Sequence, residues 1–151
     1  MSAIMISADE GAIRKMRSGK IGVVVRRSEP VIPAPFFVYV YKRKMYKGET
    51  GPGIGLVVGR FVCSEVFPDY CRQRADGRWG YWELEQSGRT QDDLIKYGRK
   101  STLYGIRISD WHDYIDPMSP DEFVGSDGKR LRIPPCGLRY VEEIDDADHV
   151  C

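Results

Sequence analysis

The sequence predicts an α+β fold, organised as a small mixed β-barrel with two or three short flanking helices. Five or more short segments are rich in β-branched and aromatic residues, a composition typical of strands. Segments with helical periodicity are few and short, and strands and helices do not alternate as they do in a parallel α/β sheet. A chain of 151 residues is the size of one domain, which we place at residues 1–144 with an acidic tail at 145–151.

The first third of the chain combines strand patterns with one helix. Ser7 and Glu10 have the spacing of a capping box, so a helix is expected to begin here, and Gly19 suits the left-handed position that ends it. The aromatic segment 36–41 is apolar on both faces, which predicts a central strand. The strands predicted in this part are residues 3–6, 21–25 and 36–41.

The rest of the chain is also dominated by strand patterns. Gly59 lies inside the longest of them and predicts a bulge or a tight bend. Thr90 is expected to cap a short helix that ends at Gly98, and Ser119 to begin a single helical turn. The predicted strands are residues 56–67, 101–108 and 138–144, with a surface insertion at 68–88 and a strand end at 109–112.

Composition excludes several classes of protein. No stretch approaches the roughly 18 apolar residues of a membrane helix, and the apolar start at 1–6 is too short for a signal peptide, so we expect a cytoplasmic protein without a membrane partner. The cysteines lack the Cys-x-x-Cys spacing of a metal site, which predicts reduced thiols, no metal and no cofactor. The cysteines are Cys63, Cys71, Cys136 and Cys151.

Charge is distributed unevenly along the chain. Residues 1–60 contain 11 Lys and Arg against 4 Asp and Glu, whereas residues 109–151 contain 4 against 11. A basic half suits an anionic partner. The acidic part either repels non-specific binding or folds back onto the basic part. Two solvated faces of opposite sign are the alternative.

The main candidate ligand-binding residues are Lys20, Arg26 and Arg27, at the two ends of the strand predicted for 21–25. An ammonium is a point charge for an anion, and a guanidinium can form two hydrogen bonds with phosphate or carboxylate. Neighbouring side chains of a strand point to opposite faces, so one of the two arginines is free to line a groove. Ion pairs with the acidic C-terminal third are the alternative.

Aromatic and polar side chains provide further candidates. Tyr39 and Tyr41 share one face of a strand and could stack on a base, although core packing is the commoner fate of strand tyrosines. Ser109, Trp111 and His112 follow a predicted strand end, where ligand-facing residues often lie. A turn and a surface tryptophan packed on a hairpin are the alternatives.

The basic run 42–47, which includes Tyr46, is either a contact to a phosphate backbone or a solvated hairpin tip. For catalysis, His112 is the candidate base at neutral pH, and Glu65 would serve if it were buried. Neither residue has a partner that can be placed from the sequence.

Eight short segments resemble, in order, those of the ASCH domain family of the PUA-like superfamily, over roughly residues 4–143. They include a Ser-Gly-Lys stretch followed by Arg-Arg, and a Val-Val-Gly-x-Phe-x-Cys strand. The last three segments together are similar to small ASCH-like proteins of phages and prophages. The segments are residues 5–16, 18–27, 38–41, 57–63, 97–98, 103–105, 108–110 and 134–142.

The resemblance implies a PUA-like barrel with a cleft beside Gly19 and Lys20 that binds RNA or a nucleotide-like ligand. It also implies two activities attached to the family, hydrolysis of acylated cytidines and nuclease activity. The amidohydrolase motif has a lysine two residues after this glycine and a threonine three residues after that lysine. Here Lys20 follows Gly19 directly, and Val23 stands three residues later. Gly22 and Val24 offer no hydroxyl either, so the motif is not intact.

The sequence therefore predicts a binding module that holds RNA or a nucleotide-like ligand in a basic, aromatic-lined cleft. One alternative is a small hydrolase that depends on Lys20 and acts on acylated cytidine or RNA. Another is a phage-encoded protein-interaction factor that uses the acidic tail at 145–151 to bind a protein partner.

Overall fold

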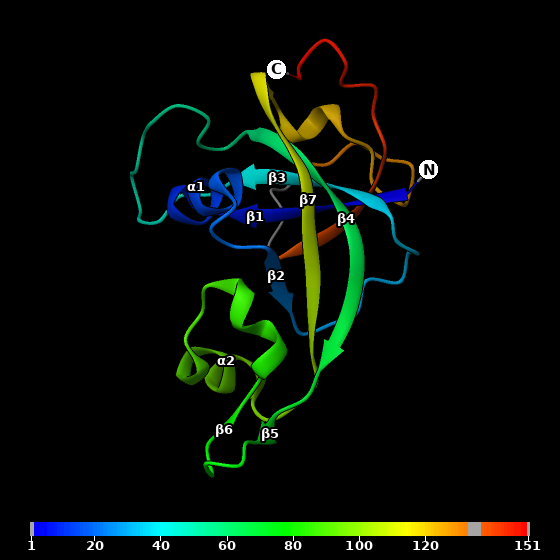
Figure 1. The fold of residues 1–151 in the computed structure, drawn as a ribbon. Coiled ribbons are helices and arrows are strands. Elements are labelled where there is room, and N and C mark those ends of the chain that lie inside the picture. The colour runs from blue at the N-terminus through cyan, green and yellow to red at the C-terminus, as the bar shows by residue number, and fades with distance from the viewer. Residues whose placement is uncertain (1, 133–136, 151) are drawn as a thin grey trace.

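The computed structural model describes residues 2–132 and 137–150 and shows an α+β fold (Figure 1). Six strands form the main sheet: β1 (Ser2–Ala8), β2 (Val23–Arg26), β3 (Phe36–Lys42), β4 (Val57–Asp69), β7 (Leu103–Met118) and β8 (Leu138–Glu142). The other elements are the helices α1 (Glu10–Ser18) and α2 (Gln91–Gly98), the hairpin of β5 (Arg72–Gln73) and β6 (Trp79–Gly80), and the short 3-10 helices η1 (Trp82–Ser87) and η2 (Pro120–Glu122). Residues 134–136 and Cys151, on which some sequence predictions fall, lie outside the described residues.

The sheet is mixed and open. Its strand order is β2-β7-β4-β3-β1-β8, with β1 and β3 parallel and the other neighbours antiparallel. The α+β class is confirmed. The predicted small barrel is not closed, since β2 and β8 remain the two edges of the sheet among the described strands. The long strands β4 and β7 run across β1 and β3 in Figure 1, so the sheet twists strongly.

Most strand predictions are confirmed. The aromatic strand β3 lies between β4 and β1, the central place that its two apolar faces indicated. The pairing of β4 with β7 shifts register beside Gly59, as the glycine predicted. The predicted strand end at 109–112 is wrong, because β7 continues to Met118. The polar residues 109–112 lie within β7, where the pairing with β4 shifts register again and Asp110 has a positive φ of 53°.

The start of α1 differs from the prediction by two residues. Strand β1 extends to Ala8, where it pairs with β3, so Ser7 lies in the strand and is not the helix cap. Asp9 is the cap instead, and its Oδ1 accepts a hydrogen bond from the N–H of Ala12 at 2.9 Å. Gly19 ends the helix in the left-handed conformation with φ 77°, as predicted.

Three buried clusters hold the fold together. The first lies between the sheet and α1, the second lies on the opposite side of the sheet, and the third lies under the insertion that contains η1 and α2. Representative members are Ile6, Ile13, Val38 and Phe61 in the first cluster, Met5, Tyr39, Val57 and Phe123 in the second, and Val25, Tyr81, Leu84 and Leu94 in the third.

The C-terminal segment 145–150 packs against β7 and is not frayed. The backbone N–H of Ile115 donates to the oxygen of His149 at 2.7 Å, and Tyr114 and Val150 form an isolated bridge. Asp146 is buried. Residues 145–150 thus fold back onto β7, and Asp146 pairs with Arg60 of the basic part, residues 1–60. In the described part of the chain, every helix is too short or too polar to cross a membrane.

Candidate functional site

A cleft of about 310 Å³ opens between the end of β1, the first turns of α1 and the edge strand β2. Arg43, directly after β3, and Ser87 and Arg89, at the end of η1, complete its walls. β2 is an edge strand of the sheet, and the cleft lies between this edge and α1.

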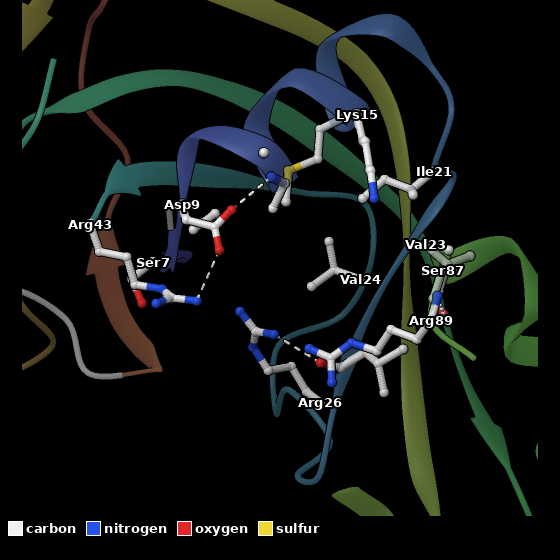
Figure 2. Close-up of a pocket in the computed structure, with 16 residues that line it drawn as sticks. Ser7, Asp9, Lys15, Ile21, Val23, Val24, Arg26, Arg43, Ser87 and Arg89 are labelled. Carbon is white, nitrogen blue, oxygen red and sulfur yellow. Dashed lines mark hydrogen bonds and ion pairs between the residues drawn. The ribbon is translucent and has the colours of Figure 1, made fainter. Parts of the chain in front are cut away.

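The cleft is cationic and has an apolar wall. Figure 2 shows Arg26, Arg43 and Arg89 around the same hollow, with Asp9 on the α1 side. Its charged residues comprise four cations and one anion: Lys15, Arg26, Arg43, Arg89 and Asp9. Its apolar wall includes Ala8, Met16, Ile21 and Val24. An anionic ligand with an apolar portion fits this combination.

Arg26 is the most constrained cation of the cleft. It ends β2, whose buried valines fix its backbone against β7. Its Nη1 donates a 2.8 Å hydrogen bond to the oxygen of Val25, but its Nε is buried and has no hydrogen-bond partner in the described structure. A buried donor without a partner costs roughly 1–3 kcal/mol, and more when it is charged.

The surroundings of Arg26 increase this cost. Burial lowers the pKa of its guanidinium below the ordinary value, and the positive charges of Arg89 and Arg43 act in the same direction, whereas Tyr97 opposes them. Arg89 and Arg43 thus both lie close enough to Arg26 to act on its charge. A bound anion would supply both the missing acceptor and the missing negative charge.

Arg43 and Asp9 form the opposite side of the cleft. The N–H of Arg43 donates to the oxygen of Ala8 at 2.9 Å, which extends the β1–β3 pairing by one residue and fixes the Arg43 backbone. Its Nη2 lies 3.4 Å from Oδ2 of Asp9, a long and partly exposed contact. Asp9 is also engaged as the cap of α1, so it compensates only part of the positive charge.

Arg89 is held by a stack of side chains. Its guanidinium carbon lies 4.8 Å from the centroid of the Tyr97 ring, and that of Arg27 lies 4.4 Å from the same centroid. Arg27 also donates from Nε to the backbone oxygen of Tyr97 at 2.9 Å. Tyr97 is on α2, so the insertion contributes to the cleft through this stack.

The structure separates the three predicted cations. Arg26 lines the cleft. Lys20 is exposed beyond the end of α1, where its N–H donates to the oxygen of Lys15 at 3.0 Å, and it does not line the cleft. Arg27 lies beside the cleft against Tyr97. Lys20 and Arg26 therefore do not converge on one hollow.

Tyr39 and Tyr41 are buried in the second cluster, away from the cleft. The Tyr39 ring packs edge-to-face on Phe123 with centroids 4.9 Å apart, and its hydroxyl accepts a 3.1 Å hydrogen bond from the N–H of Ile144. Burial raises the pKa of Tyr39 to about 12. Both tyrosines thus pack in the core, the alternative to base stacking. The described lining of the cleft contains no aromatic ring.

The three candidates on β7 also lie outside the cleft. Ser109 donates from Oγ to the oxygen of Val62 at 2.9 Å, and Trp111 stacks on Phe61 with centroids 6.3 Å apart. His112 Nε2 lies 3.2 Å from Oδ1 of Asp110. β7 continues through these three residues, so they do not lie at a strand end. Their side chains contact β4 and β7.

Glu65 does not meet the condition of burial under which it would serve as a base. Glu65 is exposed, and its Oε1 lies 3.6 Å from Nη2 of Arg107. In the described ranges, no group of three or more His, Cys, Asp or Glu residues could hold a metal ion. Cys63 is buried, which raises the pKa of its thiol to about 11 and makes it a poor nucleophile.

Sequence reasoning missed Lys15, Arg43 and Arg89 as members of one site. Arg43 belongs to the basic run 42–47, which the sequence presents as a separate feature, and Lys15 lies on the predicted helix without a signal that links it to Arg26. Arg89 follows the insertion without any local signal. Only the strand order, which brings distant segments together, could have identified this group.

No protein-family model matches the sequence, and no curated protein matches it. Solved structures with a similar fold do exist. The crystal structure of ASCH from Zymomonas mobilis matches 93% of this chain and 88% of its own, with a TM-score of 0.64 and 15% identity. A tyrosine-to-phenylalanine variant of ZmASCH matches with a TM-score of 0.64 and 14% identity, over 93% of this chain and 91% of its own. A serine-to-alanine variant matches with a TM-score of 0.65 and 14% identity, over 93% of this chain and 89% of its own. The similarity thus extends over nearly the whole of both chains.

Proposed function

We propose that this chain, which has the fold of an ASCH domain, is a binding module that holds a phosphate-bearing, nucleotide-like ligand in the cleft between α1 and β2. The ligand class follows from two properties of the cleft. Its cations require an anion, and its apolar wall accepts a flat or apolar group. RNA and free nucleotides both combine these features.

The observation that carries the proposal is the unpartnered Nε of Arg26. A purely structural arginine in a half-buried position is expected to have its donors paired. Within residues 2–132 and 137–150, Arg26 instead donates only to Val25 of its own strand, with Arg43 and Arg89 as neighbours. A phosphate group offers several acceptor oxygens to such a cluster, and guanidiniums bind phosphate through paired hydrogen bonds.

The apolar wall and the remaining polar groups suit the rest of a nucleotide. Met16, Ile21 and Val24 present a surface against which a base or ribose can pack. Ser7 and Asp9 offer hydrogen-bonding groups on the opposite side. Base stacking by Tyr39 and Tyr41 does not form part of the proposal, because both rings are buried elsewhere.

Hydrolysis of acylated cytidine has weaker support. The positions two residues after Gly19 and three residues beyond that are Ile21 and Val24, and both line the cleft. The amidohydrolase motif would require a lysine and a threonine at these two positions. Aliphatic side chains there supply neither a nucleophile nor a proton-transfer group, so binding without this reaction is the function that we propose.

A titration tests the proposal. We expect a nucleoside monophosphate and inorganic phosphate to bind the wild-type protein at low salt, as measured by isothermal titration calorimetry. Arg26→Met removes the charge and the donors while keeping the length of the side chain, and should weaken binding by roughly 10- to 150-fold. Arg139→Met, an exposed arginine on β8, is the matched control and should bind as the wild type does.

Two results would overturn the proposal. One is the absence of binding of any phosphate-bearing probe to the wild type at low salt. The other is equal affinity of the wild type and Arg26→Met, which would show that anions bind elsewhere.

A further inference from the structure

The loop after β3 leaves directly from the cleft. Arg43 lines the cleft, and Lys44, Met45, Tyr46 and Lys47 follow it in the chain. All four are exposed, and Met45 and Tyr46 expose 63% and 67% of their surface. Figure 1 shows this segment as the start of the long loop between β3 and β4.

The backbone of this loop is held at several points. Arg43 is fixed to the end of β1 by its bond to Ala8. The N–H of Met45 donates to Oε1 of Glu49 at 2.6 Å, and the N–H of Glu49 donates to the oxygen of Tyr46 at 3.2 Å. These bonds close a turn that carries the Tyr46 ring. Tyr46 is three residues from Arg43, so it lies at most ~11 Å from it along the chain.

The charges of the loop are largely uncompensated. Lys42, at the end of β3, is compensated, since it pairs with Glu10 and donates to the oxygen of Pro52 at 2.8 Å. Lys44 and Lys47 have no ion-pair partner among residues 2–132 and 137–150. An exposed aromatic ring between two free lysines, next to a cationic cleft, is the combination that binds single-stranded nucleic acid, in which the lysines contact phosphates and the ring stacks on a base.

A second exposed aromatic group on the surface lacks this combination. Trp79 and Tyr70 expose 55% and 58% of their surface near the β5–β6 hairpin. The arginines around them are paired with carboxylates, including Arg74 with Glu85 at 3.0 Å and Arg78 with Asp76 at 2.9 Å. That surface is therefore close to neutral and provides a control for exposed aromatic area alone.

We infer that residues 44–47 form a second contact site for the ligand, and that the ligand is a single-stranded polynucleotide with one phosphate at Arg26 and a neighbouring base on Tyr46. This inference rests on the proposed function, because the strand is anchored in the cleft. A free mononucleotide fills the cleft without reaching the loop.

Binding of two probes tests the inference. One is a labelled mixed-sequence RNA of about 12 nucleotides, within the range of site sizes of single-strand binding domains. The other is a nucleoside monophosphate. Affinities are measured by fluorescence anisotropy and calorimetry, each at several salt concentrations. The variants are Tyr46→Ala and the double change Lys44→Gln with Lys47→Gln. The controls are Trp79→Ala, which removes an exposed aromatic ring, and Lys129→Gln with Arg130→Gln, which removes two exposed cations. All three positions lie outside the cleft and the loop.

We expect Tyr46→Ala to weaken RNA binding by about 5- to 150-fold and to leave the monophosphate affinity unchanged. The double lysine variant should reduce the slope of log affinity against log salt for RNA by up to about 1.4, since each phosphate contact to a single strand contributes about 0.7. Both controls should bind the RNA as the wild type does. The substituted side chains are exposed, so all variants should retain the far-UV circular dichroism of the wild type.

Two results would overturn the inference and leave the proposed function intact. In one, RNA and monophosphate bind the wild type with equal affinity. In the other, the loop variants bind RNA as the wild type does. Failure of the wild type to bind either probe would overturn the proposed function, and the inference with it.

Discussion

Nε of Arg60 lies 2.6 Å from Oδ2 of Asp146, although 86 residues separate them in the chain. The same carboxylate oxygen accepts a 2.6 Å hydrogen bond from the hydroxyl of Tyr114. Arg60 also lies 4.4 Å from the centroid of the Phe37 ring. The C-terminal segment is therefore fastened to β3, β4 and β7 through one buried acid.

Replacing Asp146 tests this attachment. Asp146→Ala leaves the largely buried Arg60 without its anion, so we expect the free energy of unfolding to fall by roughly 3–5 kcal/mol. Asp148→Ala removes an exposed acid from the same segment and should change it by no more than about 0.5 kcal/mol. Urea denaturation at neutral pH measures both. Similar losses in the two variants would contradict a specific role for the buried pair.

The buried Tyr39 predicts a loss of stability at high pH. Burial raises its pKa from 10.0 to about 12, so the folded chain keeps a proton that the unfolded chain loses. The resulting stabilisation is fully present below pH 10 and disappears as the pH rises to about 12. Two pKa units correspond to about 3 kcal/mol.

Tyr39→Phe isolates this effect. Near neutral pH the variant should be less stable than the wild type by about 1 kcal/mol, because the N–H of Ile144 loses its acceptor. Above pH 10 the difference should shrink, since only the wild type contains this ionisable group. Urea denaturation at a series of pH values measures the difference. A difference that stays constant with pH would contradict the assignment.

The elements that the sequence predicted well are those with a strong local pattern. Residues 23–25 and 36–41 are β-branched or aromatic runs, and they lie in β2 and β3 with the expected burial, although β2 begins two residues later than predicted. Arg26 follows from the same pattern, because it is the polar residue that ends a buried strand. The end of β7 was missed because Ser109 and Asp110 are polar in sequence, whereas a bulged pairing with β4 keeps them within the strand.

The site as a whole was beyond local patterns. Lys15, Arg43 and Arg89 lie on three separate segments, and the twisted sheet places β2 beside α1. Lys20 and Arg27 are near Arg26 in sequence, but the left-handed Gly19 and the stack on Tyr97 direct them elsewhere. Proximity along the chain was therefore a poor guide to convergence in space.

The stack on Tyr97 predicts that Tyr97→Ala and Tyr97→Phe differ in their affinity for phosphate. Tyr97→Ala removes the ring that orients Arg89 and Arg27, and should weaken phosphate binding by about two- to fivefold, the worth of one exposed cation–π contact. Tyr97→Phe keeps the ring and should bind nearly as the wild type does. Calorimetric titration with inorganic phosphate compares them. If the two variants lose affinity equally, the ring does not position Arg89.

The position of Arg26 predicts that its replacement stabilises the ligand-free protein while it weakens ligand binding. Without ligand, its buried Nε has no acceptor and its neighbours are cations. Arg26→Met fills a similar volume without a charge, so we expect the ligand-free variant to be more stable than the wild type by about 1 kcal/mol.

Ligand should reverse that order. At a monophosphate concentration of about 100 times the dissociation constant, the wild type gains about 2.7 kcal/mol in its free energy of unfolding, while the variant, which binds weakly, gains little. Urea denaturation with and without the monophosphate measures all four values, and Arg139→Met serves again as the control for loss of an exposed arginine. A ligand-free Arg26→Met that is less stable than the wild type would mean that Arg26 supports the fold, and an equal gain from the ligand in both proteins would place the anion outside this cleft.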